Sequence, residues 1–359
     1  MFDDVTLTIG KAAYGGWESV DINRSIETIS GSCSLSVSER WPGQQVVAQV
    51  RPGASCKVTL GGDTVITGYV DEVLPEYDKS SHEVRITIRD AMGDLVDCSA
   101  KYIAGQRFNA DVVGLITTIC QPFGIKVRSD ITGLKPIPEF VIHPGQTAFE
   151  AIQQLCSYAA LLPISDGKGT LVLTRGGMGG AQAALGLGKN ILKAGGHYSS
   201  KDRYSTYTVL GQANGSGDID PDTAIGGKGV ATDAGVTRYR PLVIIADFMA
   251  VGDGAYQQRA LWEATVRAGR AYSASLTVTD WRDDAGAIWQ PNALVRLDDD
   301  FLALHDTLLI SGVRYSRSLS GSTTTLSVTR RQAFDLLPMP ASSGFYDPTP
   351  SGQRVGNSS

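Results

Sequence analysis

The chain has 359 residues and a net charge of −5, with 42% hydrophobic and 19% charged residues. This composition indicates a soluble globular protein of two to four domains and lacks the basic surface that a nucleic-acid-binding protein needs. The longest apolar run, residues 241–251, contains Asp247 and is too short to span a bilayer.

Residues 1–100 have the pattern of β-strands. Apolar and polar side chains alternate in 32–39, 55–60, 64–73 and 82–90, and Pro-Gly and Gly-Gly pairs separate these segments. The pattern predicts an antiparallel barrel or sandwich with one face exposed to solvent. The first residues, MFDDVTLTIG, are acidic and strand-like, so we expect no signal peptide there.

From about residue 107 the hydrophobic period becomes that of a helix. Asn109 is a suitable N-cap, and Pro122 and Gly124 end the pattern. The apolar side chains on one stripe are Val112, Ile116, Ile119, Cys120 and Phe123. Cys120 is therefore expected to lie in the core.

The stretch FVIHPGQTAFEAIQQLC brings His143, Glu150 and Cys156 within seventeen positions of each other (140–156). These residue types could form a nucleophilic Cys–His group. Thr147 and Glu150 also fit a capping box, which would begin a helix whose buried stripe includes Cys156. We favour the structural interpretation, because a reactive thiolate needs an electropositive and partly exposed setting.

The Gly-rich segment 176–190 resembles a phosphate-binding loop only superficially. Gly188-Lys189 is followed by Asn190 and is not preceded by the required glycine. We therefore expect a flexible linker between domains.

Strand patterns return at 204–212, and 213–235 is loop-like. A helix is predicted at 254–271, in which Arg259, Glu263 and Arg267 are spaced to pair along an exposed face. Its small-residue side, which would let it lie close to a neighbour, consists of Ala260, Ala264, Ala268 and Ala271. Strand patterns then resume from 273 to 330. The final Pro/Ser/Gly-rich residues are expected to be disordered alone and to dock on a neighbouring protein.

The two β regions resemble each other. PGASCKV, TVITGYVDEV and EVRITIRDA in the first correspond to PNALVRL, TLLISGVRYS and TTLSVTRRQA in the second. Thr67-Gly68 and Ser311-Gly312 are taken as matching positions, and residues 298–302 as an insertion in the second copy. The repeat predicts two related barrels in one chain, although strand segments share a similar composition in any case.

The remaining reactive residue types show no site pattern. Cys33, Cys56, Cys98, Cys120 and Cys156 contain no C-x-x-C pair and are expected to be buried free thiols. The histidines, which are isolated, are His82, His143, His197 and His305. Asp298-Asp299-Asp300 is expected to form a solvated hairpin tip instead of a Ca²⁺ site. Trp262, Trp281 and Trp289 are expected to be core or interface anchors instead of a sugar platform.

The chain resembles the baseplate hub proteins of contractile-tailed phages, of the Mu type, with a more distant likeness to the T4 hub and the late control D group. The resemblance covers nearly the whole chain, and the segments that carry it are 140–175, 190–212, 237–247, 259–270, 280–297 and 308–316.

The resemblance implies an α+β fold, mainly β, with two related antiparallel β-barrels separated by smaller α/β domains. The expected divisions are 1–100 (first barrel), 101–176 (mixed α/β with two helices), 177–212 plus 272–335 (second barrel), 213–271 (inserted loop and helix) and 336–359 (tail).

The same resemblance implies a structural late protein that is made in the host cytoplasm and placed in the virion baseplate. It would be a homotrimeric, pseudo-sixfold ring that joins the tail tube to a membrane-piercing spike and passes DNA at ejection without inserting into a membrane. It implies no enzyme activity, no catalytic or metal-binding residues and no cofactor. Two alternatives stay open: a tail-associated cell-wall hydrolase using Cys156 and His143, and a peptidoglycan-binding unit within 107–175.

Overall fold

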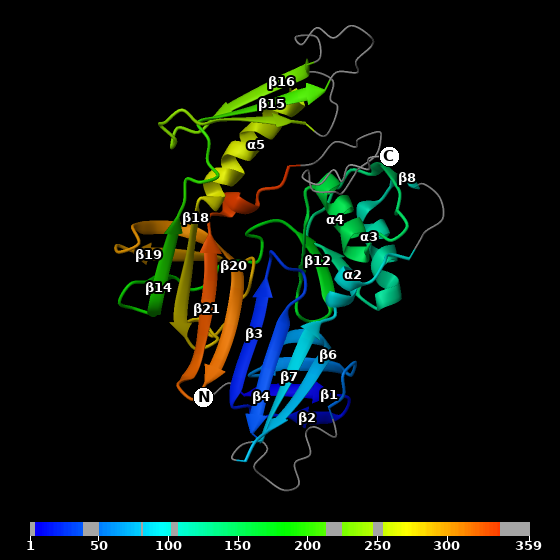
Figure 1. The fold of residues 1–359 in the computed structure, drawn as a ribbon, viewed down its shortest axis with the longest axis vertical. Helices are drawn as coiled ribbons and strands as arrows, with labels where there is room; N and C mark the ends of the chain where they lie inside the picture. Colours follow the sequence, from blue (N-terminus) through cyan, green and yellow to red (C-terminus); the bar gives the residue numbers. More distant parts are fainter. Residues whose placement is uncertain are drawn as a thin grey trace, which may run out of the picture. The chain divides into compact units, whose positions relative to one another are not determined.

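The computed structural model describes residues 4–38, 50–79, 82–101, 107–212, 225–246 and 254–337 (Figure 1). The chain divides into two compact units. Among the described residues, those in 4–203 and 262–337 belong to unit 1, and those in 204–261 belong to unit 2. The tail expected at 336–359 lies almost entirely outside the described residues.

Unit 1 is built on a sheet of thirteen strands, which follow one another in the order β14-β18-β21-β20-β3-β4-β7-β6-β5-β1-β2, with β19 and β13 continuing from β20. All of its ladders are antiparallel except the one between β13 and β19. The strands are β1 (Val5–Ile9), β2 (Ala12–Tyr14), β3 (Ser19–Ser25), β4 (Ser32–Ser38), β5 (Ser55–Leu60), β6 (Asp63–Tyr77), β7 (His82–Asp90), β13 (Leu185–Gly186), β14 (Ile191–Tyr198), β18 (Tyr272–Thr279), β19 (Leu294–Asp299), β20 (Leu304–Ser318) and β21 (Gly321–Thr329).

The sheet contains the same five-stranded arrangement twice. The order β3-β4-β7-β6-β5 in the first half corresponds to β14-β18-β21-β20-β19 in the second. The matched strands β5 and β19 have 6 residues each, β6 and β20 have 15 each, and β7 and β21 have 9 each. Both long strands carry a register shift, next to Asp71 in β6 and Ser311 in β20. The repeated order supports the duplication that the sequence predicts.

The structure corrects two details of that repeat. Gly68 pairs with Asp90 before the shift in β6, whereas Gly312 pairs with Ser327 directly after the shift in β20, so these glycines are not equivalent. The turn between β19 and β20 covers 300–303, because Asp298 and Asp299 belong to β19 and are not an insertion.

The two halves form one continuous sheet. The second half of β20, which extends beyond β19, pairs with β3 from Gly312↔Ser25 to Arg317↔Val20 (Figure 1). Within the described residues, the ladders form an open path, and none of them closes a barrel. The observed architecture is therefore mainly β with a large antiparallel sheet. One hydrophobic core contains residues of both halves, among them Ile22, Trp289 and Tyr315.

The middle of unit 1 folds as an α/β segment with its own core. Its elements are α2 (Gly93–Asp97), β8 (Arg107–Ala110), α3 (Val112–Cys120), the 3₁₀ turn η1 (Gln121–Phe123), β9 (Lys126–Ser129), β10 (Ile137–Phe140), α4 (Ala148–Ala159), β11 (Leu162–Ser165) and β12 (Thr170–Thr174). β8 pairs with β10, while β12 pairs antiparallel with β11 and parallel with β9.

Both predicted helices of this segment are present. The N-cap of α3 is Asp111 and not Asn109, because the Asp111 carboxylate accepts a hydrogen bond from the Gly114 amide while Asn109 has a positive φ of 48°. Val112, Ile116, Ile119 and Cys120 are buried, and Phe123 is partly buried. Gly124 ends the helix with a φ of 67° in the left-handed region.

The segment 176–190 is not a free linker. It runs along β19: β13 pairs with Leu297 and Asp298, and the amides of Gly179 and Gln182 donate to the carbonyls of Asn292 and Leu294. A Cβ at Gly179 would lie 2.7 Å from the Asn292 backbone, so glycine permits this close approach. The Gly-rich composition thus serves backbone packing.

Unit 2 contains a three-stranded sheet, β16-β15-β17, which corrects two expectations. Its strands are β15 (Thr206–Gln212), β16 (Ile225–Thr232) and β17 (Pro241–Ile245). The strand at 204–212, expected in the second barrel, pairs here instead, and part of the expected loop 213–235 forms β16.

The helix α5 (Gly254–Arg270) spans the unit boundary. Tyr256 in its first turn packs on the unit 2 sheet, where a Cβ at Gly211 or Gly229 would collide with it. Glu263, expected on an exposed face, is only 7% exposed and accepts a hydrogen bond from Arg267 Nε at 2.9 Å. Close to the end of α5, Gly269 allows the η2 turn (Arg331–Phe334) to approach the helix.

Candidate functional site

Glu150 and Cys156 both have structural roles in the helix α4. The Thr147 hydroxyl accepts from the Glu150 amide at 3.1 Å, and the Glu150 carboxylate accepts from the Thr147 amide at 2.8 Å, which is the predicted capping box. Cys156 is 2% exposed, and burial raises the pKa of its thiol to about 12. His143 is exposed before the helix. A thiol with this pKa is protonated at neutral pH and is a poor nucleophile.

The other cysteines are also free thiols, and most of them are buried. Burial raises the pKa of Cys56 and Cys120 to about 12 and also raises that of Cys33. Cys98 is exposed, which corrects the expectation that all five are buried. It directly follows the short helix α2.

The acidic residues 298–300, at the end of β19 and the start of the turn that follows it, are only partly solvated. Asp298 and Asp300 are exposed and lie next to the ring of His305, whereas Asp299 is 1% exposed and accepts from the Leu302 amide at 2.9 Å. Asp299 therefore orders the turn from inside. In the part of the chain that the structure describes, no group of three or more His, Cys, Asp or Glu side chains is placed to hold a metal ion.

Two of the three singled-out tryptophans lie in the main core. Trp281 and Trp289 are 1% and 2% exposed. Trp262 is partly buried, and its Nε1 donates to the Asp335 carbonyl at 2.7 Å, which fastens the residues after η2 to the helix. This arrangement agrees with their prediction as anchors.

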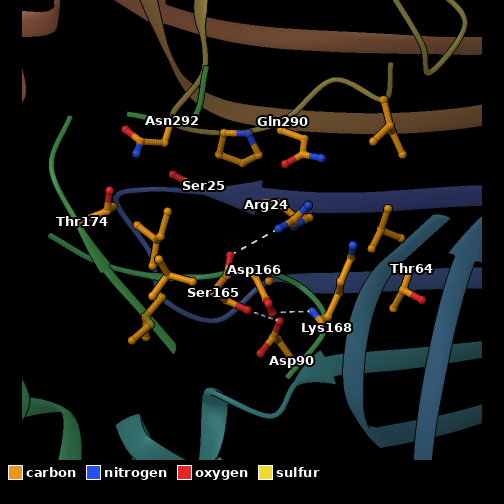
Figure 2. Close-up of a pocket in the computed structure, with 18 of the residues that line it drawn as sticks. Arg24, Ser25, Thr64, Asp90, Ser165, Asp166, Lys168, Thr174, Gln290 and Asn292 are labelled. Atoms are coloured by element: carbon orange, nitrogen blue, oxygen red, sulfur yellow. Dashed lines mark hydrogen bonds between the residues drawn. The ribbon is translucent and has the colours of Figure 1, made fainter. Parts of the chain in front are cut away.

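A polar cavity of about 490 Å³ lies where three regions of unit 1 meet (Figure 2). The first β half contributes Arg24 and Asp90, the α/β segment contributes 164–166 and Lys168, and the second β half contributes 290–292. Sequence reasoning did not identify this cavity, because its lining residues come from positions far apart in the chain and match no motif.

The side chains of Arg24, Asp90 and Ser165 connect two of these regions (Figure 2). Arg24 Nη2 donates to the Ser165 carbonyl at 3.2 Å, and the Ser165 hydroxyl donates to Asp90 Oδ2 at 2.7 Å. The other Asp90 oxygen accepts from the Met92 amide at 2.9 Å. Burial raises the pKa of Asp90, while the nearby Arg24 opposes this shift. The α/β segment is thus held to the first β half by buried polar contacts.

The loop after Ser165 fits closely against the first β half. Gly167 has a φ of +75°, and a Cβ there would lie 2.3 Å from the Val65 carbonyl oxygen. The Gly167 amide donates to the Ser165 hydroxyl at 3.0 Å. Only glycine satisfies both the backbone angle and the space available.

Asn292 connects the second β half to the end of the α/β segment. It is 1% exposed and adopts a φ of 67°. Its Oδ1 accepts from the Gly177 amide at 2.8 Å, and its Nδ2 donates to the Arg175 carbonyl at 3.0 Å. The cavity is therefore bordered by polar contacts that fix three regions to each other, and none of the described residues that line it is a histidine.

Four family descriptions match successive parts of the chain. They are "Mu phage baseplate assembly protein GpP-like, N-terminal" at 4–90, "Baseplate hub protein gp44-like, second domain" at 92–175, "Tail protein NMB1110-like, third domain" at 203–260 and "Mu phage baseplate assembly protein GpP, fourth domain" at 253–337.

Similar proteins come from phages and prophages. The chain is 34% identical to baseplate hub protein gp44 of Escherichia phage Mu, over 93% of this chain and 89% of that protein. The 43 kDa tail protein of prophage MuSo2 from Shewanella oneidensis has a TM-score of 0.83 at 33% identity, covering 93% of this chain and all of that one. A tail protein from Neisseria meningitidis has the same fold, with a TM-score of 0.78 at 21% identity over 93% and 98% of the two chains.

Among the described helices, none combines the length and apolar character needed to cross a membrane. The order of the four matched domains and the similarity to gp44 over nearly the whole length agree with the fold described above. The chain therefore belongs to the baseplate hub protein family of Mu-like phages and is a structural component of the tail baseplate in the virion.

Proposed function

We propose that the chain forms a homotrimeric hub ring. Each of the three subunits would contribute its two β halves, so that the ring would contain six similar barrel-like units. The observation that carries this proposal is the repeated strand order, β3-β4-β7-β6-β5 and β14-β18-β21-β20-β19. Three copies of a duplicated subunit can present approximate sixfold symmetry to a tail tube and threefold symmetry to a spike.

The ring would join the tail tube above to the membrane-piercing spike below and would leave a channel for DNA at ejection. The net charge of −5 supports a channel that DNA only transits, because a strongly basic surface would retain phosphates. The proposed role uses contact surfaces and requires no catalytic, cofactor-binding or metal-binding residue.

We also propose a division of the subunit at residues 100, 176, 203, 271 and 335, in which β15 (Thr206–Gln212) belongs to the inserted unit. The family matches at 4–90 and 92–175 and the compact unit 204–261 support it. In this organisation the polar contacts around Asp90 and Asn292 hold the α/β segment between the two β halves.

The decisive experiment measures the mass and symmetry of the purified protein. We expect sedimentation equilibrium to give three times the mass of the 38.1 kDa chain at high protein concentration, and electron micrographs to show rings. A strict monomer that forms no ring even with the tail spike protein added would refute the proposal.

A further inference from the structure

The polar cavity of unit 1 has a volume of about 490 Å³ and lies where the two β halves and the α/β segment meet (Figure 2). Sites that hold small molecules usually have volumes of about 300–1,000 Å³. Because one water molecule occupies about 30 Å³, the cavity has room for a ligand much larger than a single water. The charged groups of its lining determine which ligand it favours.

Four aspartates line the cavity within the described residues, and two of them form ion pairs. Asp63 pairs with Arg282 at 2.8 Å, and Asp130 pairs with Arg128. The negative charges of these two carboxylates are therefore compensated by arginines.

The other two aspartates are stabilised by neutral donors. Asp90 accepts from the Ser165 hydroxyl at 2.7 Å and from a backbone amide at 2.9 Å. Asp166 Oδ1 accepts from the amides of Lys168 and Thr170 at 2.7 Å and 3.0 Å. Each carboxylate of the lining thus has hydrogen-bond donors of its own.

The cations that remain are Arg24 and Lys168. Arg24 is 8% exposed and donates to the Ser165 carbonyl at 3.2 Å and to the Tyr315 hydroxyl. Lys168 is exposed and lines the same cavity. Within the described residues, neither of these side chains forms an ion pair with a carboxylate. A guanidinium has five N–H donors, so two neutral acceptors leave some of the Arg24 donors available.

The two cations and one side-chain amide come from three different regions. Figure 2 shows the Lys168 side chain extending from its loop toward Arg24, while Gln290 lies beyond Arg24 in the same view. The loop is close to the guanidinium, because a Cβ at Gly167 would lie 3.1 Å from Arg24 Cζ. Arg24 belongs to β3, Lys168 to the β11–β12 loop and Gln290 to the loop before β19, so each region contributes one donor.

A further polar atom of the lining supports a ligand. Thr174 is 1% exposed, and its Oγ1 is buried without a hydrogen-bond partner among the described residues. A buried hydroxyl without a partner is costly, so this side of the cavity favours a polar ligand group or an ordered water.

We infer that the cavity binds a small oxyanion, whose phosphate or carboxylate group is held between the Arg24 guanidinium and the Lys168 ammonium. Guanidinium groups suit oxyanions because two parallel N–H groups can donate to two oxygens, and an ammonium adds a positive charge. The amide of Gln290 supplies a further donor from the second β half. The bound anion would join the three regions, and the site does not depend on the proposed ring.

Titration of the full-length protein with inorganic phosphate tests the inference. Phosphate replaces chloride at constant pH and ionic strength, and binding is followed by calorimetry and by the thermal unfolding midpoint. We expect one phosphate per chain, a dissociation constant on the order of 1 mM and a rise of the midpoint that saturates. A rise that continues without saturation, together with no measurable heat of binding, would overturn the inference.

Two lysine variants with the same change in charge locate the site. Lys168→Gln is expected to weaken phosphate binding about fivefold. Lys126→Gln removes an exposed lysine of the same α/β segment that does not line the cavity, and it should bind like the wild type. Phosphate also stabilises proteins by exclusion from their surfaces, but that effect should be equal in both variants. Equal binding by the two variants would contradict the inferred site.

Stronger substitutions test both cations. Arg24→Gln is expected to abolish phosphate binding, but it also removes the contact with the Ser165 carbonyl and could lower stability. Lys168→Glu leaves that contact intact and places a negative charge beside the anion, so it should also abolish binding. Unchanged binding by Lys168→Glu would overturn the inference even if Arg24→Gln does not fold.

Citrate and hydrogen exchange complete the test. Citrate offers carboxylates in place of phosphate, and binding of either anion that depends on Lys168 supports the site, whereas failure of both overturns it. A bound anion should slow amide exchange in 164–170, the loop that carries Lys168. Protection only in segments that do not line the cavity would show that the anion binds elsewhere and would overturn the assignment.

Discussion

The hydroxyl of Ser165 donates a 2.7 Å hydrogen bond to the carboxylate of Asp90, which is 75 residues earlier in the chain and only 2% exposed. Removing the hydroxyl by Ser165→Ala leaves a buried carboxylate oxygen without this donor. We expect a loss of about 1–3 kcal/mol in the free energy of unfolding, measured by urea denaturation. A double-mutant cycle with Asp90→Asn should show coupling between the two sites, and additive effects would contradict the contact.

The stability of the protein should depend on the ionisation of Asp90. Burial raises the folded-state pKa of this carboxyl, so the folded state holds its proton to higher pH than the unfolded state does. The stability contributed by the protonated form is complete below the unfolded pKa of about 3.9 and is lost as the pH rises through the folded pKa. Relative to Asp90→Asn, the wild type should therefore lose stability as the pH rises through this range. A wild type that gains stability relative to Asp90→Asn as the pH rises through this range would refute the direction.

Gly167 and Gly133 form a matched pair for testing the close fit of the loop. Both have a positive φ, +75° and +70°, but a Cβ at Gly167 would collide with Val65 while a Cβ at Gly133 meets nothing. Gly133→Ala should lower the free energy of unfolding by about 1–2 kcal/mol, because alanine disfavours the left-handed backbone conformation. Gly167→Ala should lower the free energy of unfolding by more than Gly133→Ala does, as measured by thermal or urea denaturation. Equal losses in the two variants would mean that the contact with Val65 does not contribute to stability.

Thiol labelling should distinguish Cys98 from the other cysteines. Cys98 is exposed, whereas Cys33, Cys56, Cys120 and Cys156 are buried. A thiol reagent should modify about one cysteine per native chain and five after unfolding, as counted by intact mass. Cys98→Ser should abolish the native reaction. Rapid modification of native Cys156 would reopen the catalytic hypothesis.

His305 should titrate above its ordinary range because it is hydrogen-bonded to Asp298. Proton-detected NMR should show a pKa above 6.5 for His305 in the wild type and a lower value in Asp298→Asn. Because the folded pKa is raised, the associated stability is present below the unfolded pKa and is lost as the pH rises through the folded one. An unchanged pKa in the variant would contradict the pairing.

Elements defined by neighbouring residues were predicted well. Thr147 and Glu150 are three residues apart, so their capping box and the buried side of α4 could be inferred from the sequence. The strands near 55–60 and 82–90 were predicted because alternation also depends on adjacent residues. Asn109 was wrong as a cap because Asp111, two residues later, competes for the same role.

Contacts between distant segments could not be predicted in this way. No local pattern places Ser165 beside Asp90, and the glycines of 176–190 look the same in a flexible linker as in a segment packed along β19. The similarity of SCSLSVS (32–38) to SASLTVT (273–279) is a further sequence signal of the repeat. These two segments precede PGASCKV and PNALVRL, respectively, and extend the repeat by a strand.

The bulges beside Asp71 and Ser311 divide each long strand between different neighbours. In β20, the residues before the bulge pair with β19 and those after it pair with β3, while β21 pairs with the strand from Leu309 to Ser318. Inserting or deleting a residue elsewhere in such a strand would turn side chains to the opposite face against at least one neighbour. Engineered tags and natural length variation should therefore be tolerated in the turn at 300–303 and rejected inside the strand.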